Sequence, residues 1–151
     1  MIRPLERTDY QRVYLLLQEF AQETGLGYLG ETHYYDYQHI HQVLLRCERA
    51  GVSFVAQNGR QITGMFLSLT LPDLWIPTVR HLKELAWYVQ PEFRGTSLGA
   101  RLFFAYVKEA EKRLEMGHIQ GYTMTKLSSS DNFDYERRGM RLIETTYLRE
   151  A

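Results

Sequence analysis

The stretch Gln90–Phe104, QPEFRGTSLGARLFF, connects a predicted strand to a predicted helix and restricts the fold more than any other part of the chain. The run before it, HLKELAWYVQP, is typical of a strand that Pro91 ends. From Ser97 or Leu98 to about Met116, apolar residues recur at helical spacing. This part of the chain therefore reads as strand, turn, helix.

The turn itself contains Gly95 and Gly99, which adopt backbone angles that other residues avoid and let a ligand approach closely. The first N–H groups of a helix have no intrahelical partner, and the helix dipole adds a partial positive charge there. Arg94 adds a full positive charge. The turn can therefore bind an anion such as a phosphate, although a glycine turn that only reverses the chain is the alternative.

The elements outward from this turn follow from apolar spacing and turn residues. Residues 2–5 are a strand candidate, and two helices follow, with apolar faces at Val13, Leu16, Leu17 and Phe20 and at Tyr37, Ile40, Leu44 and Cys47. Asn58-Gly59 separates two β-rich runs and indicates a hairpin. After the central helix come a strand in 118–127, a short helix in 128–139 and a last strand from Met140. The expected order is β-α-α-β-β-β-α-β-α-β.

Length and composition restrict the classes of protein. The 151 residues, with 44% hydrophobic and 24% charged residues, predict a single globular domain over 1–151. Lys+Arg and Asp+Glu are both 18, so no net charge favours binding to nucleic acid or to an anionic membrane. No run approaches the length of a membrane span, no leader is evident, and Cys47 is the only cysteine. We expect a cytoplasmic protein without a membrane partner.

The motifs of two common phosphate-binding loops, G-x-x-x-x-G-K-[ST] and G-x-G-x-x-G, are absent. The element order, the strand ELAWYVQP and the following RGTSLGARLF instead resemble the GCN5-related N-acetyltransferase (GNAT) family over nearly the whole chain. Arg94 and Gly99 match the ends of its R/Q-x-x-G-x-G/A pattern, and Ser97 replaces the middle glycine. In DYERRGM, Tyr135 and Gly139 match the family's Y-E-x-x-G-F ending.

The resemblance implies a mixed, mostly antiparallel α/β sheet flanked by about four helices, with acetyl-CoA as the acetyl donor. It places the pyrophosphate of acetyl-CoA on backbone amides of the turn, and the pantetheine arm along the preceding strand. The implied cofactor-binding residues are Tyr88, Val89, Arg94, Gly95, Thr96, Ser97, Leu98, Gly99, Ala100 and Ser128. Ser128 stands where the family often has asparagine, and the Ser97 hydroxyl can donate to phosphate.

Acetyl transfer to an amine needs a base, donors to the carbonyl and an acid for the departing thiolate. Glu84, on the strand before the turn, is the candidate base, because burial would raise its pKa. The alternative is that Glu84 faces solvent or pairs with Lys83. By the resemblance, Tyr135 is the candidate acid, and packing into the core is its alternative.

The aromatic-rich segments GYLGETHYYDY and LPDLWIP are the candidate acceptor sites, with Tyr28, Tyr34 and Trp75 as substrate-binding residues. The alternative is that these rings cover the sheet or form a dimer contact. His39 and His41 are two residues apart and fall on different helix faces, so we expect no metal.

The leading hypothesis is an N-acetyltransferase that acts on a primary amine of a small molecule or a protein by direct attack in a ternary complex. The alternative is a catalytically inactive GNAT-like domain that binds CoA or a protein partner. The resemblance also makes a homodimer an expectation.

Overall fold

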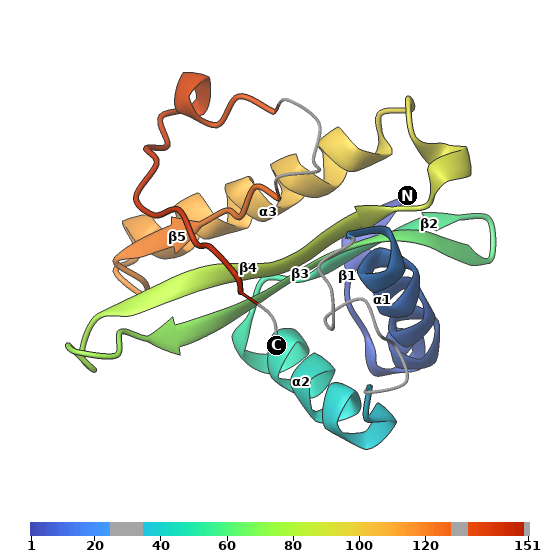
Figure 1. Ribbon diagram of the computed structural model, residues 1–151, viewed down its shortest axis with the longest axis horizontal. Coiled ribbons are helices and arrows are strands. Elements are labelled where there is room, and N and C mark those ends of the chain that lie inside the picture. The colour runs from blue at the N-terminus through green and yellow to red at the C-terminus, as the bar shows by residue number, and fades with distance from the viewer. Residues whose placement is uncertain (25–34, 128–132, 150–151) are drawn as a thin grey trace.

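The computed structural model describes residues 1–24, 35–127 and 133–149, and its described part is built around one five-stranded sheet (Figure 1). In chain order the elements are β1 (Ile2–Pro4), α1 (Tyr10–Thr24), α2 (Tyr37–Ala50), β2 (Phe54–Asn58), β3 (Gln61–Pro72), β4 (Arg80–Val89), α3 (Leu98–Glu115) and β5 (Gly121–Thr123). The described residues also contain short 3-10 turns at Arg7–Asp9, Pro91–Phe93 and Glu136–Arg138.

The strands lie in the order β1-β2-β3-β4-β5, and all neighbours are antiparallel except β4 and β5. The predicted hairpin at Asn58-Gly59 is confirmed, since β2 ends at Asn58 and Gly59 has a φ of +60°, which favours glycine. The parallel pairing of β5 with β4 covers only three residues, from His81 to Lys83 on β4. The C-terminal half of β4 therefore extends beyond β5 and is paired only with β3.

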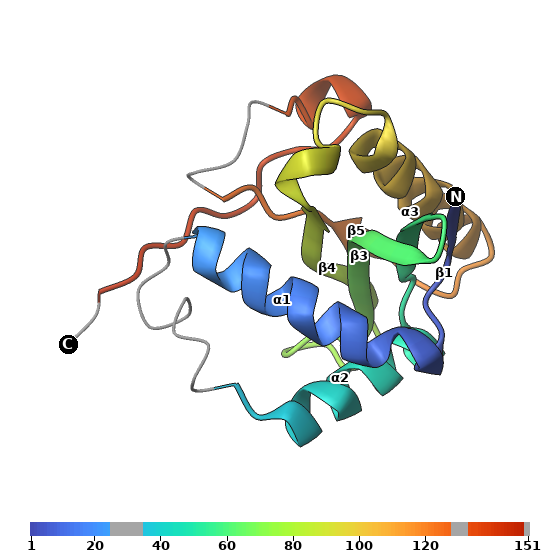
Figure 2. The same cartoon turned by 90° about the vertical axis from the view of Figure 1, so that its right-hand side faces the viewer.

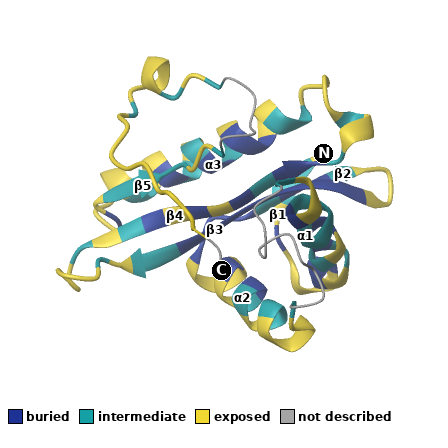
Figure 3. Ribbon diagram, viewed as in Figure 1, coloured by how far each residue is buried: buried dark blue, intermediate teal, exposed yellow. Residues whose placement is uncertain are grey.

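Helices cover both faces of the sheet (Figure 2). Helices α1 and α2 pack on one face, over a core that includes Val13, Leu16 and Leu44. Helix α3 packs on the other face, where Leu102 and Tyr106 contact a second core. The apolar faces predicted for the three helices lie largely in the core, and Figure 3 shows the buried residues between the helices and the sheet. Tyr37, the first residue of α2, was predicted in such a face and is 44% exposed instead.

Strand β4 contains a β-bulge at Leu85, which has no partner because the register with β3 shifts by one residue. Before the bulge, Leu82 packs in the core beneath α3, whereas after it Ala86 and Tyr88 pack in the core beneath α1 and α2. Side chains alternate along a strand, so a strand without the bulge would place all of these on one face. Glu84 shares the alternation of Leu82, and its carboxylate therefore lies on the α3 side.

The end of the chain differs from the expected order. The expected short helix is a single 3-10 turn at Glu136–Arg138, so that three α-helices rather than about four flank the sheet in the described residues. Residues 140–149 contain no strand, and Leu142, Ile143 and Tyr147 are exposed there. A strand needs a hydrogen-bonded neighbour as well as a suitable composition, and this segment has none. The single domain over 1–151 stays a prediction.

Candidate active site

The predicted anion-binding turn lies between β4 and α3, and its backbone explains Gly95. This glycine has a φ of +77°, in the left-handed region that other residues avoid. The Thr96 hydroxyl donates to the carbonyl of Phe93 at 2.6 Å and accepts from the N–H of Leu98 at 3.3 Å. Ser97 has φ −75° and ψ 0°, so the position where the family has glycine accepts a side chain without backbone strain. The turn is thus well defined before any ligand binds.

Gly99 is not required by the fold in the same way. A Cβ atom there would lie 3.9 Å from Val89 Cγ2 and 4.0 Å from Trp87 Cζ2, which are ordinary van der Waals distances. Alanine is also the better helix former, by about 1 kcal/mol in a helix interior. The N–H groups of Gly99 and Ala100 lie in the first turn of α3 and have no intrahelical partner. The absence of a side chain and the available donors fit a phosphate that approaches the backbone closely.

Arg94 is held beside this turn by three groups. Its Nε donates to the carbonyl of Val89 at 2.7 Å, and its two terminal nitrogens donate to the carboxylate of Glu23 at 2.6 Å each. The guanidinium also lies over the ring of Tyr88, 5.3 Å from the centroid. The hydrogen bond to Glu23 raises the pKa of Arg94 further. Arg94 is therefore charged and adjacent to the turn, but it shares its charge with a carboxylate of α1.

Tyr88 and Val89 contribute differently to the site. The Tyr88 side chain is buried beneath α1, and its hydroxyl donates to Glu19 at 3.3 Å. Burial raises the pKa of Tyr88 to about 12. Val89 packs in the core on the opposite face, with Leu102 of α3. The Tyr88 side chain thus faces away from α3, and its ring meets the turn only through the guanidinium of Arg94.

Glu84 is buried, with 7% of its surface exposed, and does not face solvent. Its Oε2 accepts a hydrogen bond from the N–H of Thr125 at 3.0 Å, just beyond the end of β5. Burial raises the pKa of Glu84 from 4.5 to about 7, and the hydrogen bonds from Thr125 and the charge of Lys83 only partly oppose this. A carboxylate that titrates near neutral pH can accept a proton at physiological pH.

Two tyrosines lie within electrostatic reach of this carboxylate. Tyr135, at the start of the 3-10 turn 136–138, is half-buried, and burial together with the charge of Glu84 raises its pKa to about 12. Tyr106 of α3 is fully buried, donates to the carbonyl of Thr123 at 3.3 Å, and has its pKa raised by the same two causes. Both phenols remain protonated at neutral pH. The structure thus brings Glu84 and Tyr135, predicted separately from the sequence, into one electrostatic environment.

An aromatic cluster connects Tyr135 to the rest of the site. Trp87 of β4 and Phe103 of α3 stack with ring centroids 5.5 Å apart, and Phe133 lies 5.5 Å from the first ring and 5.0 Å from the second. The ring of Tyr135 is 4.9 Å from that of Phe133. The guanidinium of Arg138 lies 4.9 Å from the centroid of the Phe133 ring. These contacts attach segment 133–138 to β4 and α3.

Sequence reasoning did not identify Thr125, Phe133, Arg138 or Glu23 as parts of this site. No local pattern marks them, since each contacts a residue that is distant in sequence. The bulge at Leu85, which directs Glu84 toward α3, is also invisible in the sequence, because it arises from a register shift between two strands.

Of the three predicted substrate-binding residues, only Trp75 belongs to the part of the chain that the structure describes. Tyr28 and Tyr34, as well as the cofactor residue Ser128, lie outside the described residues. Trp75 is 85% exposed in the loop between β3 and β4, at the end of β4 remote from the turn. Cys47 is buried, and burial raises the pKa of its thiol to about 11, which makes it unreactive.

Residues 1–24, 35–127 and 133–149 contain no group of three or more His, Cys, Asp or Glu that could hold a metal ion. Over the same ranges, no helix has both the length and the apolar character needed to span a bilayer.

Comparisons with known proteins identify the family and the fold. Residues 10–133 match the family model described as "Acetyltransferase (GNAT) family". The comparison with curated proteins found no match. Among solved structures, a ribosomal-protein-alanine N-acetyltransferase from Brucella melitensis biovar Abortus 2308 is 18% identical with a TM-score of 0.71, covering 100% of this chain and 98% of its own.

Two further solved structures have the same fold. A predicted acetyltransferase with acetyl-CoA from Clostridium acetobutylicum is 13% identical with a TM-score of 0.74, covering 99% of this chain and 95% of its own. An aminoglycoside acetyltransferase from an uncultured soil metagenomic sample, in complex with sisomicin, is 14% identical with a TM-score of 0.66, covering 99% and 96%. At such identities the likeness is one of fold.

Proposed function

The chain belongs to the acetyltransferase (GNAT) family, and from this premise we propose that it transfers an acetyl group from acetyl-CoA to a primary amine. The observation that carries the proposal is Glu84, a buried carboxyl group with a pKa of about 7 on the strand that runs into the anion-binding turn. Burial of a carboxylate with one backbone hydrogen bond destabilises a fold, and here the charge of Glu84 also acts on the half-buried phenol of Tyr135.

In this proposal the turn binds the donor. The backbone N–H groups of residues 95–100 and the Arg94 guanidinium hold the pyrophosphate, and Gly99 lets the phosphate approach the helix. The part of β4 that extends beyond β5, including the backbone of Tyr88 and Val89, holds the pantetheine arm. Ser128 completes the proposed contacts. Acetyl-CoA supplies the activated acetyl group, and the protein supplies position and proton transfer.

The chemistry needs one bond to form and one to break. The amine nitrogen attacks the thioester carbonyl carbon, and the proton that the nitrogen loses passes to the carboxylate of Glu84, directly or through water. As the carbon–sulfur bond breaks, the Tyr135 hydroxyl donates a proton or a hydrogen bond to the thiolate. The products are an amide and a free thiol. Direct attack needs donor and acceptor bound together, so the proposed reaction passes through a ternary complex.

The acceptor is proposed only as a class, a primary amine of a small molecule or of a protein. Structures of the same fold include an aminoglycoside acetyltransferase and a ribosomal-protein-alanine N-acetyltransferase, so the fold serves both kinds of amine. Tyr28, Tyr34 and Trp75 stay the proposed acceptor contacts. A cytoplasmic location and a homodimer also remain proposals.

The test is thiol release from acetyl-CoA over a panel of amines that includes an aminoglycoside, a polyamine and a peptide with an N-terminal alanine. We expect turnover with at least one acceptor, and a fall in kcat of about 10²-fold or more for Glu84→Gln. Tyr135→Phe should lower kcat by about tenfold to 10²-fold. Both variants should bind CoA within about twofold of the unmodified protein by calorimetry.

The control is Lys108→Gln, which removes an exposed charge on α3 away from the site and should leave kcat unchanged. If CoA binds but no amine on the panel is acetylated, the alternative of a catalytically inactive CoA-binding or protein-binding domain is the correct one. Turnover that survives both substitutions would overturn the proposed roles of Glu84 and Tyr135.

A further inference from the structure

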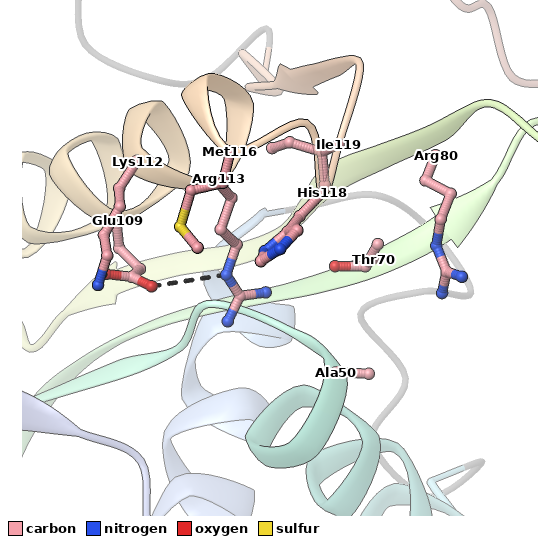
Figure 4. A pocket seen from close by; sticks show the side chains of 9 residues that line it. All are labelled: Ala50, Thr70, Arg80, Glu109, Lys112, Arg113, Met116, His118 and Ile119. Carbon is pink, nitrogen blue, oxygen red and sulfur yellow. Dashed lines mark ion pairs between the residues drawn. The ribbon is translucent and has the colours of Figure 1, made fainter.

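A cavity of about 400 Å³ lies at the opposite end of α3 from the anion-binding turn (Figure 4). The last turns of α3, the loop after it, the end of α2, and strands β3 and β4 all contribute to its lining. At 1.5 Å per residue, Arg113 lies about 21 Å along the helix from Gly99. The cavity is therefore separate from the site described above, and its volume suits a small metabolite.

Positive charge dominates the lining. Arg80, Lys112 and Arg113 are cations, and Glu109 is the only carboxylate in the lining. Glu109 pairs with Arg113 at 3.6 Å and with Lys112 at 4.0 Å. Two of the cations thus share one carboxylate as their ion-pair partner. Arg80 has no ion pair with any residue in the described part of the chain. We call this site the basic cavity.

Stabilisation of α3 by basic residues at its C-terminal end explains only part of the positive charge in the basic cavity. Basic residues in the last turn of a helix interact favourably with its dipole, and this explains Lys112 and Arg113. Arg80 comes from β4 instead. Its N–H donates to Oε1 of Gln120 at 2.6 Å and its carbonyl accepts from the N–H of Gln120 at 2.8 Å, so the backbone at Arg80 is fixed against the loop after α3.

The lining also contains an unused polar group. The Oγ1 of Thr70 on β3 is buried and has no hydrogen-bond partner, although most buried hydroxyl groups have one. In Figure 4, Thr70 lies between Arg113 and Arg80. A hydroxyl in this place can donate to an oxygen of an anion that binds between the two arginines.

We propose that the basic cavity binds a small organic polyanion, with carboxylate or phosphate oxygens between Arg80 and Arg113 and a hydrogen bond from Thr70. Two guanidinium groups on different elements favour a ligand with at least two negative charges. The proposal does not depend on acetyl transfer, because it requires only binding.

The experiment is calorimetric titration of the full chain with citrate and, separately, with glucose 6-phosphate, which distinguish a carboxylate from a phosphate ligand. We expect at least one probe to bind. Arg80→Gln and Arg113→Gln should each raise its Kd about tenfold or more, and Thr70→Val about threefold to tenfold. Circular dichroism and thermal unfolding check that each variant is folded, and Lys112→Gln, which removes a largely exposed charge, replaces any variant that is not.

Two controls locate the binding. Lys108→Gln removes a cation from the same helix outside the cavity, and Arg94→Gln removes the cation of the anion-binding turn. Both should change the Kd by less than about twofold. Absence of heat from both probes at ten-millimolar concentration would overturn the proposal. So would a Kd that Arg80→Gln leaves unchanged or that Arg94→Gln alters as much as Arg113→Gln does.

Discussion

The two anion sites that we propose at the ends of α3 would bind anions by opposite means. At the N-terminal end the donors are backbone N–H groups, and the helix dipole favours the anion. At the C-terminal end the dipole disfavours an anion, and side-chain cations from α3 and β4 have to outweigh it. The first site therefore depends on backbone conformation and on Gly95 and Gly99, and the second on charge that folding collects. Each of the following predictions separates the two ends.

The largest effect concerns pH and turnover at the N-terminal end. Because Glu84 must be deprotonated to accept a proton, kcat/KM should fall about tenfold per pH unit below pH 7. In the Glu84→Gln variant this decrease should be absent, so that kcat/KM varies only with the protonation of the amine substrate. The Lys108→Gln variant should show the same decrease below pH 7 as the unmodified protein. A profile from pH 5 to 9 measures this, and a limb near pH 7 that persists in Glu84→Gln would assign the titration to another group.

The second effect concerns the free energy of unfolding. The pKa of Glu84 is about 7 in the folded protein and 4.5 ordinarily, so the folded state binds more protons between these values. Stability therefore falls as pH rises from 4.5 to 7, by about 3 kcal/mol in all. Glu84→Gln removes this loss and should stabilise the protein by about 1–3 kcal/mol at pH 8.

Urea unfolding at pH 4 and pH 8 tests this difference. At pH 4 the carboxyl group is protonated in both states, and Glu84→Gln should have little effect. Lys108→Gln serves as the comparison, since it should follow the pH dependence of the unmodified protein. A stabilisation of equal size at both pH values would mean that desolvation of the charge is not its cause.

The third effect compares the two glycines of the turn. Gly99→Ala should stabilise the protein slightly, by up to about 1 kcal/mol, because a Cβ has room and alanine favours the helix. It should also weaken CoA binding about tenfold, because the Cβ occupies space proposed for phosphate. Gly95→Ala should destabilise by about 1–2 kcal/mol, because of its positive φ.

Urea unfolding and CoA calorimetry on the same two variants give both quantities. Neither substitution should affect citrate binding at the basic cavity. If Gly99→Ala binds CoA as tightly as the unmodified protein, the phosphate does not approach the helix at this residue.

The smallest effect concerns the carboxylates that share the cations. Glu23 pairs with Arg94 at 2.6 Å, and Glu109 pairs with Arg113 at 3.6 Å. Glu23→Gln should raise CoA affinity about twofold to fivefold, and Glu109→Gln should raise citrate affinity by a similar factor. Each should leave the other ligand unaffected. Calorimetry at 0.05 M and 0.5 M salt measures both affinities. If the increase in affinity is as large at high salt as at low salt, its origin is not electrostatic.

Much of the fold could be predicted, because the deciding signals are local. The hairpin at Asn58-Gly59 and the limits of α3 depend on nearby residues. The segment from Met140 has the composition of a strand, but residues 140–149 have no strand partner. The last strand was predicted wrongly because strand formation depends on pairing between distant segments, which the composition of one segment does not reveal.

The candidate site also has one part that could be predicted from the sequence and one part that could not. The turn from Arg94 to Ala100 could be located because its donors belong to consecutive residues. The environment of Glu84 could not be, because it depends on Thr125 and on a bulge opposite β3. The basic cavity was not foreseen at all, since Arg80 and Arg113 are 33 positions apart in the sequence.

By itself, the sequence determined the strand-turn-helix unit, most of the helix faces that become buried, and which residues we propose to contact phosphate through the backbone. These properties follow from the spacing of nearby residues and from the conformational freedom of glycine. Only the tertiary structure decided that Glu84 is buried within electrostatic reach of Tyr135 and that cations from two elements line one cavity. Burial and electrostatic interaction act through space, so a pKa near 7 and a basic cavity exist only once the sheet and α3 have packed together.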